Sequence, residues 1–88
     1  MATPTPVVAG VVRDDDGHPV AAARVYVVDA PVPVPDIAAL SGPDGTFSVG
    51  LPVAGRYTME AAAEGRAPAR ATFEVVPGHN WLDLRLGG

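Results

Sequence analysis

The chain of 88 residues has no cysteine, a hydrophobic fraction of 48% and a formal net charge of −4, values that fit one globular domain over residues 1–88 and exclude disulfide stabilisation. Its six basic residues are arginines scattered along the chain, so the concentrated positive face of a nucleic-acid-binding protein is not expected. No apolar stretch approaches the length that spans a bilayer, so membrane insertion is not expected either.

The N-terminal segment lacks the features of a signal peptide. No basic residue precedes Arg13, and the segment contains no uninterrupted apolar run of signal length. As written, the sequence therefore predicts a cytoplasmic protein. A segment cut from a longer exported protein would have the same features, and its location would then be extracellular or at the cell surface.

The apolar residues come in short runs with a period of two, separated by turn residues at regular spacing, and this pattern predicts a sandwich or barrel of β-strands. In chain order, the expected strands cover residues 7–13, 23–28, 37–41, 46–49 and 56–63, then a sixth strand through Phe73 and a seventh through Leu84. A helix between positions 59 and 70 is not expected, because Gly65 and Pro68 interrupt that segment.

Proline and glycine mark the connections between these strands. Pro31, Pro33 and Pro35 lack the N–H that a central strand donates, so their segment is expected to be a stiff connection or a sheet edge. The segment 42–45 (GPDG) has a proline and a glycine at the turn positions that favour them. The proline segment is also expected to block one edge of the sandwich against pairing with another chain.

Alternation within the strands predicts which side chains face the core. The fold class that follows is an all-β, seven-stranded antiparallel Greek-key sandwich. The side chains expected to point inward are those of Val12, Val25, Val27, Phe47, Tyr57, Met59, Phe73, Leu82, Leu84 and Leu86. Tyr57 begins its strand directly after a turn, where its hydroxyl can bond to the backbone as in the tyrosine corner of related sandwiches.

Three groups of residues occur in an order and spacing that resemble those of a known family. They are segments 10–12, 16–20 and 23–27 (GVV, DGHPV and ARVYV), segment 41–47 (SGPDGTF), and segments 51–57 and 63–65 (LPVAGRY and AEG). Over residues 8–86 the chain resembles carboxypeptidase regulatory-like domains, which implies a transthyretin-like (prealbumin-like) fold. The resemblance also implies an accessory module that packs against or presents another protein. Arg66 departs from the family pattern, in which an aromatic residue usually follows the AEG turn.

Catalysis is not expected from this sequence, and neither is a metal or cofactor site. Ser41 and Ser48 are the only serines, and no nucleophile-elbow motif surrounds either of them. The two histidines, His18 and His79, lie in turns far apart in the sequence, and without cysteine they do not make a zinc site. The contiguous aspartates at positions 14–16 lack the alternating spacing of a calcium loop, so a solvated turn is expected there.

Trp81 and Tyr26 are the candidate binding residues, because both are aromatic and the alternation of their strands points their neighbours inward. An exposed tryptophan can stack on a sugar ring or anchor a protein partner, or it can cover the sheet rim beside the turn at Pro77. Whether Tyr26 lies near Trp81 depends on the order of the strands, which one sequence does not determine.

The leading functional hypothesis is a non-catalytic interaction module that docks a protein partner or another copy of itself, for instance by pairing of exposed sheet edges. One alternative is a carbohydrate-binding module that holds a polysaccharide with Trp81. A second alternative is a carrier protein, because Gly87 and Gly88 resemble the di-glycine tail of ubiquitin-like proteins and sulfur carriers. Against this alternative, the β-grasp fold of those proteins requires a helix that the sequence does not predict.

Overall fold

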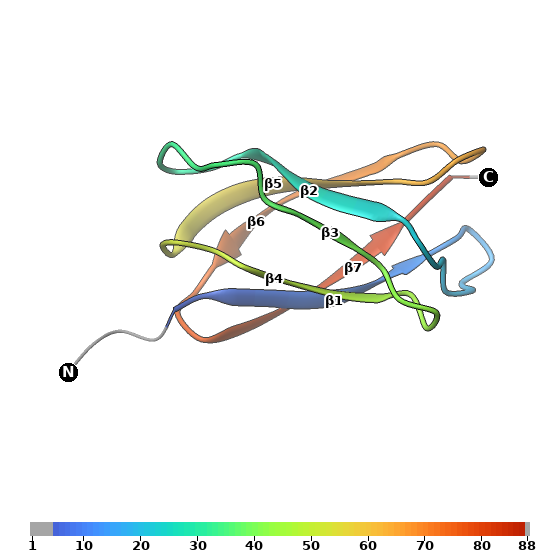
Figure 1. Cartoon of the computed structure of the whole chain (residues 1–88), viewed down its shortest axis with the longest axis horizontal. Coiled ribbons are helices and arrows are strands. Elements are labelled where there is room, and N and C mark those ends of the chain that lie inside the picture. Colours follow the sequence, from blue (N-terminus) through green and yellow to red (C-terminus); the bar gives the residue numbers. More distant parts are fainter. Residues whose placement is uncertain (1–4, 88) are drawn as a thin grey trace.

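The computed structural model describes residues 5–87, and these residues form two stacked β-sheets without any helix (Figure 1). Their seven strands are β1 (Val7–Arg13), β2 (Arg24–Asp29), β3 (Ala38–Leu40), β4 (Thr46–Gly50), β5 (Gly55–Ala62), β6 (Ala69–Val75) and β7 (His79–Arg85). The smaller sheet has the strand order β4-β1-β7, and the larger sheet has the order β3-β2-β5-β6. The predicted seven-stranded sandwich is confirmed. Within the described part of the chain, no helix is long and apolar enough to cross a membrane.

The expected antiparallel pairing holds for every strand pair except β1 and β7. These two strands run parallel, from Val7 opposite His79 to Arg13 opposite Arg85. The path of the chain is the reason, since β6 ends in the larger sheet and the turn at 76–78 carries β7 across to the smaller one. As a result β1 has a partner on both sides and forms the centre of the smaller sheet (Figure 1).

All ten side chains predicted to face inward belong to the core or pack against it. Three of them, Val27, Phe73 and Leu82, are only partly buried, and the other seven are buried. The five strand ranges predicted from the sequence agree with the observed bounds to within one residue at each end. Alternation of apolar residues was therefore sufficient to identify both the strands and their inner faces.

Two side chains fasten turns to the core through buried hydroxyl groups. The Tyr57 hydroxyl donates a hydrogen bond to the Val53 carbonyl at 2.7 Å, and the tyrosine itself is completely buried. This contact confirms the predicted tyrosine corner and holds the turn between β4 and β5. The buried Ser41 hydroxyl donates to the Val20 carbonyl at 2.6 Å and accepts from the Ala23 N–H at 2.9 Å. Ser41 thus joins the end of β3 to the segment that leads into β2.

Gly10 lies in the middle of β1, between its two partner strands. It is opposite Phe47 of β4 on one side and Leu82 of β7 on the other. A Cβ atom at this position would overlap the Leu82 carbonyl oxygen and lie 2.8 Å from Cζ of Phe47. The Phe47 ring occupies the space that a larger residue would fill, and it remains only 5% exposed.

Replacement of Ser41 by alanine should destabilise the fold, because it leaves two buried backbone groups, the Val20 carbonyl and the Ala23 N–H, without the hydroxyl that they bond to. A buried polar group left without its partner costs roughly 1–3 kcal/mol, so we expect Ser41→Ala to lower the free energy of unfolding by about that amount or more. Urea unfolding followed by circular dichroism measures the change. The matched control is Ser48→Ala, on the exposed face of β4, which should change stability by about 0.5 kcal/mol or less. Equal effects of the two substitutions would contradict the role assigned to Ser41.

Candidate functional site

Trp81 projects from the outer face of the smaller sheet. Its neighbour Leu82 faces the core, so the alternation of β7 turns the indole outward, and 63% of the residue is exposed. In the strand register, Trp81 lies beside Ala9 of β1, which in turn lies beside Ser48 of β4. Because both neighbours are small, the surface directly beside the exposed ring is low. The predicted outward orientation of Trp81 is confirmed, and its role in binding stays a prediction.

Charged residues lie beside Trp81 on the same outer face, toward the C-terminal end of β7. Asp83 and Arg85 follow Trp81 at alternate positions of β7 and are both exposed. Arg13 of β1 lies opposite Arg85, and its Nε is 3.9 Å from the Asp83 carboxylate. This surface therefore combines an exposed aromatic ring with polar groups beside it, which is the composition of many docking sites.

Tyr26 lies on β2, in the other sheet. It is half-buried, and its hydroxyl donates a hydrogen bond to the Glu60 carboxylate on β5. This bond lowers the pKa of Glu60 and raises the pKa of Tyr26. Arg70 of β6 adds a second partner, with its Nη2 at 3.3 Å from Oε1 of Glu60. Tyr26 is thus one member of a polar row that crosses three strands, rather than a free aromatic side chain.

The structure does not bring the two predicted binding residues together. Trp81 belongs to the smaller sheet and Tyr26 to the larger one, and both point away from the core between the sheets. The two side chains therefore lie on opposite outer surfaces of the sandwich and cannot contact one compact ligand. Strand order decides this arrangement, and the local sequence around either residue carries no signal for it.

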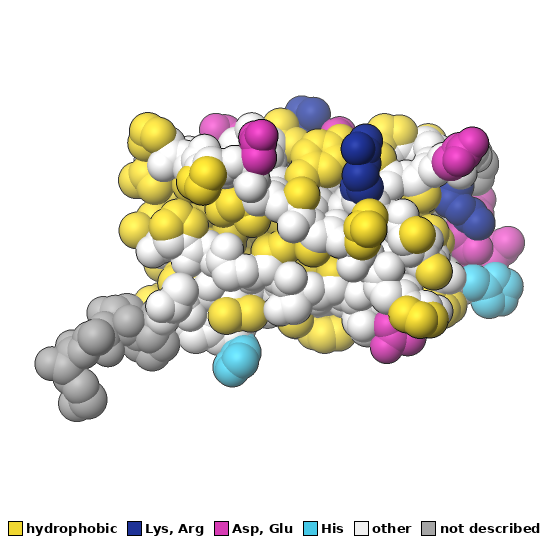
Figure 2. Space-filling view, in the orientation of Figure 1, with side chains coloured by type: hydrophobic (Ala, Val, Ile, Leu, Met, Phe, Trp, Pro, Cys, Tyr) yellow, Lys and Arg dark blue, Asp and Glu magenta, His cyan; other side chains and the backbone are white. Residues whose placement is uncertain are grey.

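A further apolar surface lies where β2 leads through the proline segment to β3. Figure 2 shows hydrophobic side chains gathered over this connection at one end of the molecule. Its exposed members include Val28 and Val32, which are 42% and 40% exposed. The sequence predicted this connection from its prolines, but it did not predict the apolar surface.

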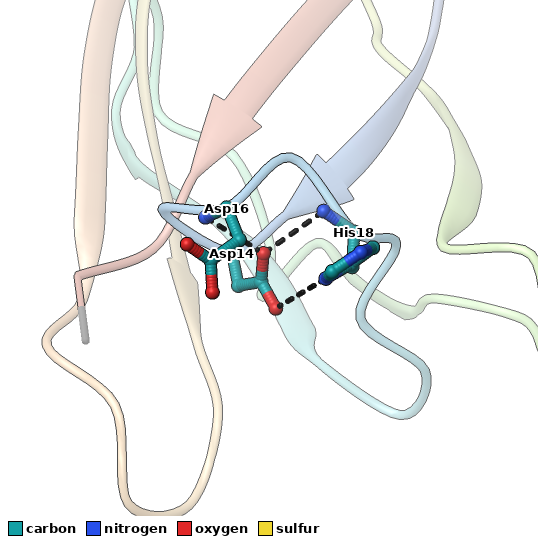
Figure 3. A group of neighbouring side chains, drawn as sticks. All are labelled: Asp14, Asp16 and His18. Carbon is teal, nitrogen blue, oxygen red and sulfur yellow. Dashed lines mark hydrogen bonds and ion pairs between the residues drawn. The ribbon is translucent and has the colours of Figure 1, made fainter.

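The turn between β1 and β2 holds a cluster of ionisable side chains (Figure 3). Oδ1 of Asp14 accepts hydrogen bonds from the backbone N–H groups of Asp16, at 3.0 Å, and His18, at 2.9 Å. Its Oδ2 lies 3.7 Å from Nη1 of Arg66, which comes from the connection between β5 and β6. The expectation of a solvated turn therefore holds for Asp15 and Asp16, which are exposed, but not for Asp14, which is buried.

This cluster is better explained as a clasp between two loops than as a metal site. Asp14, Asp16 and His18 could offer three ligand atoms within 4.8 Å of one another. However, Oδ1 of Asp14 already accepts two N–H groups, and Oδ2 faces the positive charge of Arg66. A cation would have to compete with all three donors, whereas the clasp satisfies the carboxylate without one.

The other residues considered as candidates, for catalysis or for a carrier function, either make structural hydrogen bonds or lie outside the described residues. The Ser41 hydroxyl donates to a backbone carbonyl and is buried, so it is not presented as a nucleophile. The N–H of Gly87 donates to the Ala67 carbonyl at 3.0 Å, which fixes this glycine against the start of the β6 segment. Gly88, the other residue of the di-glycine tail, lies outside the described residues.

Comparison with known proteins identifies the family. The model of the carboxypeptidase regulatory-like domain matches residues 7–87 of the chain. This match confirms the resemblance seen in the sequence and covers the whole sandwich. None of the curated proteins matches the chain significantly.

Solved structures share the fold at low sequence identity. Chlorocatechol 1,2-dioxygenase from Pseudomonas putida aligns with a TM-score of 0.75 and 13% identity, over 98% of this chain and 61% of that one. A chain of a type II cohesin–X–dockerin complex from Acetivibrio cellulolyticus gives 0.71 and 16%, over 92% and 56%. A DUF3823 family protein from Parabacteroides merdae gives 0.69 and 20%, over 97% and 47%. The chain thus spans about half to three fifths of these structures, and the likeness shows the fold alone.

The Asp14 clasp should make part of the stability depend on pH. The His18 N–H is the main cause that holds the pKa of Asp14 below its usual 3.8. A carboxyl group with a lowered pKa in the folded state stabilises the fold above its unfolded pKa and loses this contribution as the pH falls through the folded value. We expect Asp14→Asn to lower the free energy of unfolding at neutral pH, and the difference from the unmodified chain to shrink in acid.

Urea unfolding from neutral to acid pH measures this difference. The control is Asp15→Asn in the same turn, which removes an equal charge from an exposed position. The control should leave the stability of the chain almost unchanged at every pH. A deficit of Asp14→Asn that stayed constant down to strongly acid pH would show that its charge does not stabilise the clasp.

Proposed function

The chain belongs to the carboxypeptidase regulatory-like domain family, and we propose that it acts as a non-catalytic interaction module. In this role it docks a protein partner or a second copy of itself through the outer surfaces and edges of its sheets. The observation that carries the proposal is the exposure of Trp81, the only tryptophan of the chain, on the outer face of the smaller sheet.

The surroundings of Trp81 fit a docking site. Tryptophan is enriched among the few residues that supply most of the binding free energy of protein interfaces. Such residues lie within an apolar centre that a polar rim surrounds. Here the low surface at Ala9 lies beside the ring, and Asp83 and Arg85 extend the same strand with opposite charges. A partner could therefore cover the indole and pair with charges at its margin.

The comparisons support an interaction role at the level of architecture. One of the similar structures is a chain of a cohesin–X–dockerin complex, a protein assembly by its own description. The groups that would supply hydrolytic chemistry are dispersed, since the Ser41 hydroxyl is tied to the backbone and both histidines lie in exposed positions at different strands or turns. These observations favour docking over catalysis as the role of this sandwich.

Carbohydrate binding is a second candidate function, because the exposed indole could stack on the face of a sugar ring. Trp81 is the only tryptophan, so intrinsic tryptophan fluorescence of the chain reports on this position alone. A saturable change of that fluorescence on titration with cell-wall polysaccharide would favour the sugar-binding function. No change across the titration would exclude it for the polysaccharide tested.

The docking proposal predicts that Trp81→Ala weakens partner capture. Loss of an interface tryptophan typically costs about 2 kcal/mol or more, so we expect retention of specific partners to fall roughly tenfold or more. Immobilised chain is exposed to lysate of the source organism, and retained proteins are quantified by mass spectrometry. Leu40→Ala is the matched control, since Leu40 is an equally exposed apolar residue of the other sheet. Retention by Trp81→Ala as high as that by the unmodified chain would remove Trp81 from the docking surface.

A further inference from the structure

β6 is an edge strand along which the core of the sandwich is incompletely closed. It pairs with β5 over its full length, and among the described residues no other strand pairs with it. Phe73 and Ala71 face inward from β6 but are only partly buried, whereas Tyr57 and Met59, opposite them on β5, are 0% exposed. The apolar inner face of the larger sheet therefore reaches solvent at this edge.

The other three edge strands are less suited to pairing. β3 has only three residues, and the proline segment that precedes it cannot donate the hydrogen bonds of a longer ladder. β4 has five residues and is shorter than β6, which has seven. On β7, pairing of two copies about its middle residue would place Trp81 opposite Asp83 of the second copy. Such a pairing brings no carboxylate opposite an arginine. β6 has seven residues between Pro68 and Pro77, and it lies on the far side of the sandwich from β3 and β4 (Figure 1).

The sequence of β6 is complementary to itself in the antiparallel direction. A two-fold axis through Thr72, its middle residue, would place Arg70 opposite Glu74 of a second copy, and this pair would occur twice. On the inner face, Ala71 would lie opposite Phe73 of the second copy and cover part of its exposed ring. At the axis, the two Thr72 side chains would be direct neighbours, a pair that is favourable across strands.

The charges on the outer face of the larger sheet extend this complementarity. Arg70 already lies 3.3 Å from the carboxylate of Glu60, and Glu74 lies 3.2 Å from Nε of Arg56. The side chains of Arg70 and Glu74 remain 59% and 63% exposed, so each has a free side for a further partner. Across the two copies, the row from Glu60 through Arg70 to the second copy's Glu74 and Arg56 would alternate in sign throughout.

We propose that β6 pairs with β6 of a second copy of this chain, antiparallel and centred on Thr72, so that two four-stranded sheets become one continuous sheet. This inference rests on the proposed interaction function and names one partner, the chain itself. The dimer satisfies the free backbone groups of the edge and buries the apolar side chains that β6 leaves partly exposed.

Two charge reversals test the pairing, because each disrupts it alone and together they restore it. Arg70→Glu places carboxylates opposite each other at both ends of the paired strands, and Glu74→Arg places guanidinium groups there. Like charges across an interface are strongly unfavourable, so each variant should raise the dimer dissociation constant roughly tenfold or more. In an equimolar mixture of the two variants every pair is again opposite in sign, and a dimer of one variant with the other should form.

Sedimentation velocity over a concentration series measures the assembly, starting from the 9.0 kDa monomer. Arg24→Glu is the control, since it reverses an exposed charge on β2, which β5 separates from the paired edge. It should dimerise like the unmodified chain. Circular dichroism of each variant verifies that the sandwich is folded.

Three results would overturn the inference: an unmodified chain that stays monomeric up to millimolar concentration, charge variants that dimerise undiminished, or a mixture that fails to recover. If capture of a protein partner through Trp81 persists in any of these cases, only the pairing through β6 fails. If neither self-association nor partner capture is found, the proposed interaction function fails as well.

Discussion

The absence of a side chain at Gly10 is the constraint on which the arrangement of the smaller sheet depends. β1 is the central strand of that sheet, and at Gly10 its two partners come so close that a Cβ atom would overlap the backbone of Leu82 and nearly touch Phe47. Glycine in the interior of a strand is usually unfavourable, because it loses much conformational freedom and adds no packing. Here that cost is offset by Phe47, whose ring fills the vacant space and is buried in the core.

β1 lies between β4 and β7 in the smaller sheet, whereas β2, β5 and β6 belong to the larger sheet. The exposed aromatic and charged groups of the two sheets therefore lie on opposite outer surfaces of the sandwich. β7 runs parallel to β1, and its alternation directs Trp81 outward from the smaller sheet. The polar row of Tyr26, Glu60 and Arg70 occupies the opposite outer face. A small sandwich of this kind therefore offers two separate outer surfaces with the core between them.

The sequence was sufficient for the features that depend on local periodicity and on turn chemistry. The strands, their inner faces and the tyrosine corner at Tyr57 all follow from residues within a few positions of one another, and the structure confirms them. Features that depend on contacts between distant segments were not accessible in this way. The parallel pairing of β1 with β7 and the burial of Asp14 beside Arg66 both require the order of the strands in space. The separation of Tyr26 from Trp81 has the same origin.

The chain has no lysine, the side chain that most often protects exposed edge strands against pairing with another chain. Prolines precede β3 and flank both β4 and β6, so they limit the length of these edge strands without distinguishing β6 from β4. β6 differs from β3 and β4 in its greater length of seven residues, and its charges attract or repel according to the direction of pairing. In a parallel, in-register stack each Arg70 would face another Arg70, and each Glu74 another Glu74, so that this arrangement is disfavoured. In the antiparallel arrangement the same two residues attract, so the pattern on β6 opposes open-ended stacking while it favours a closed pair of copies.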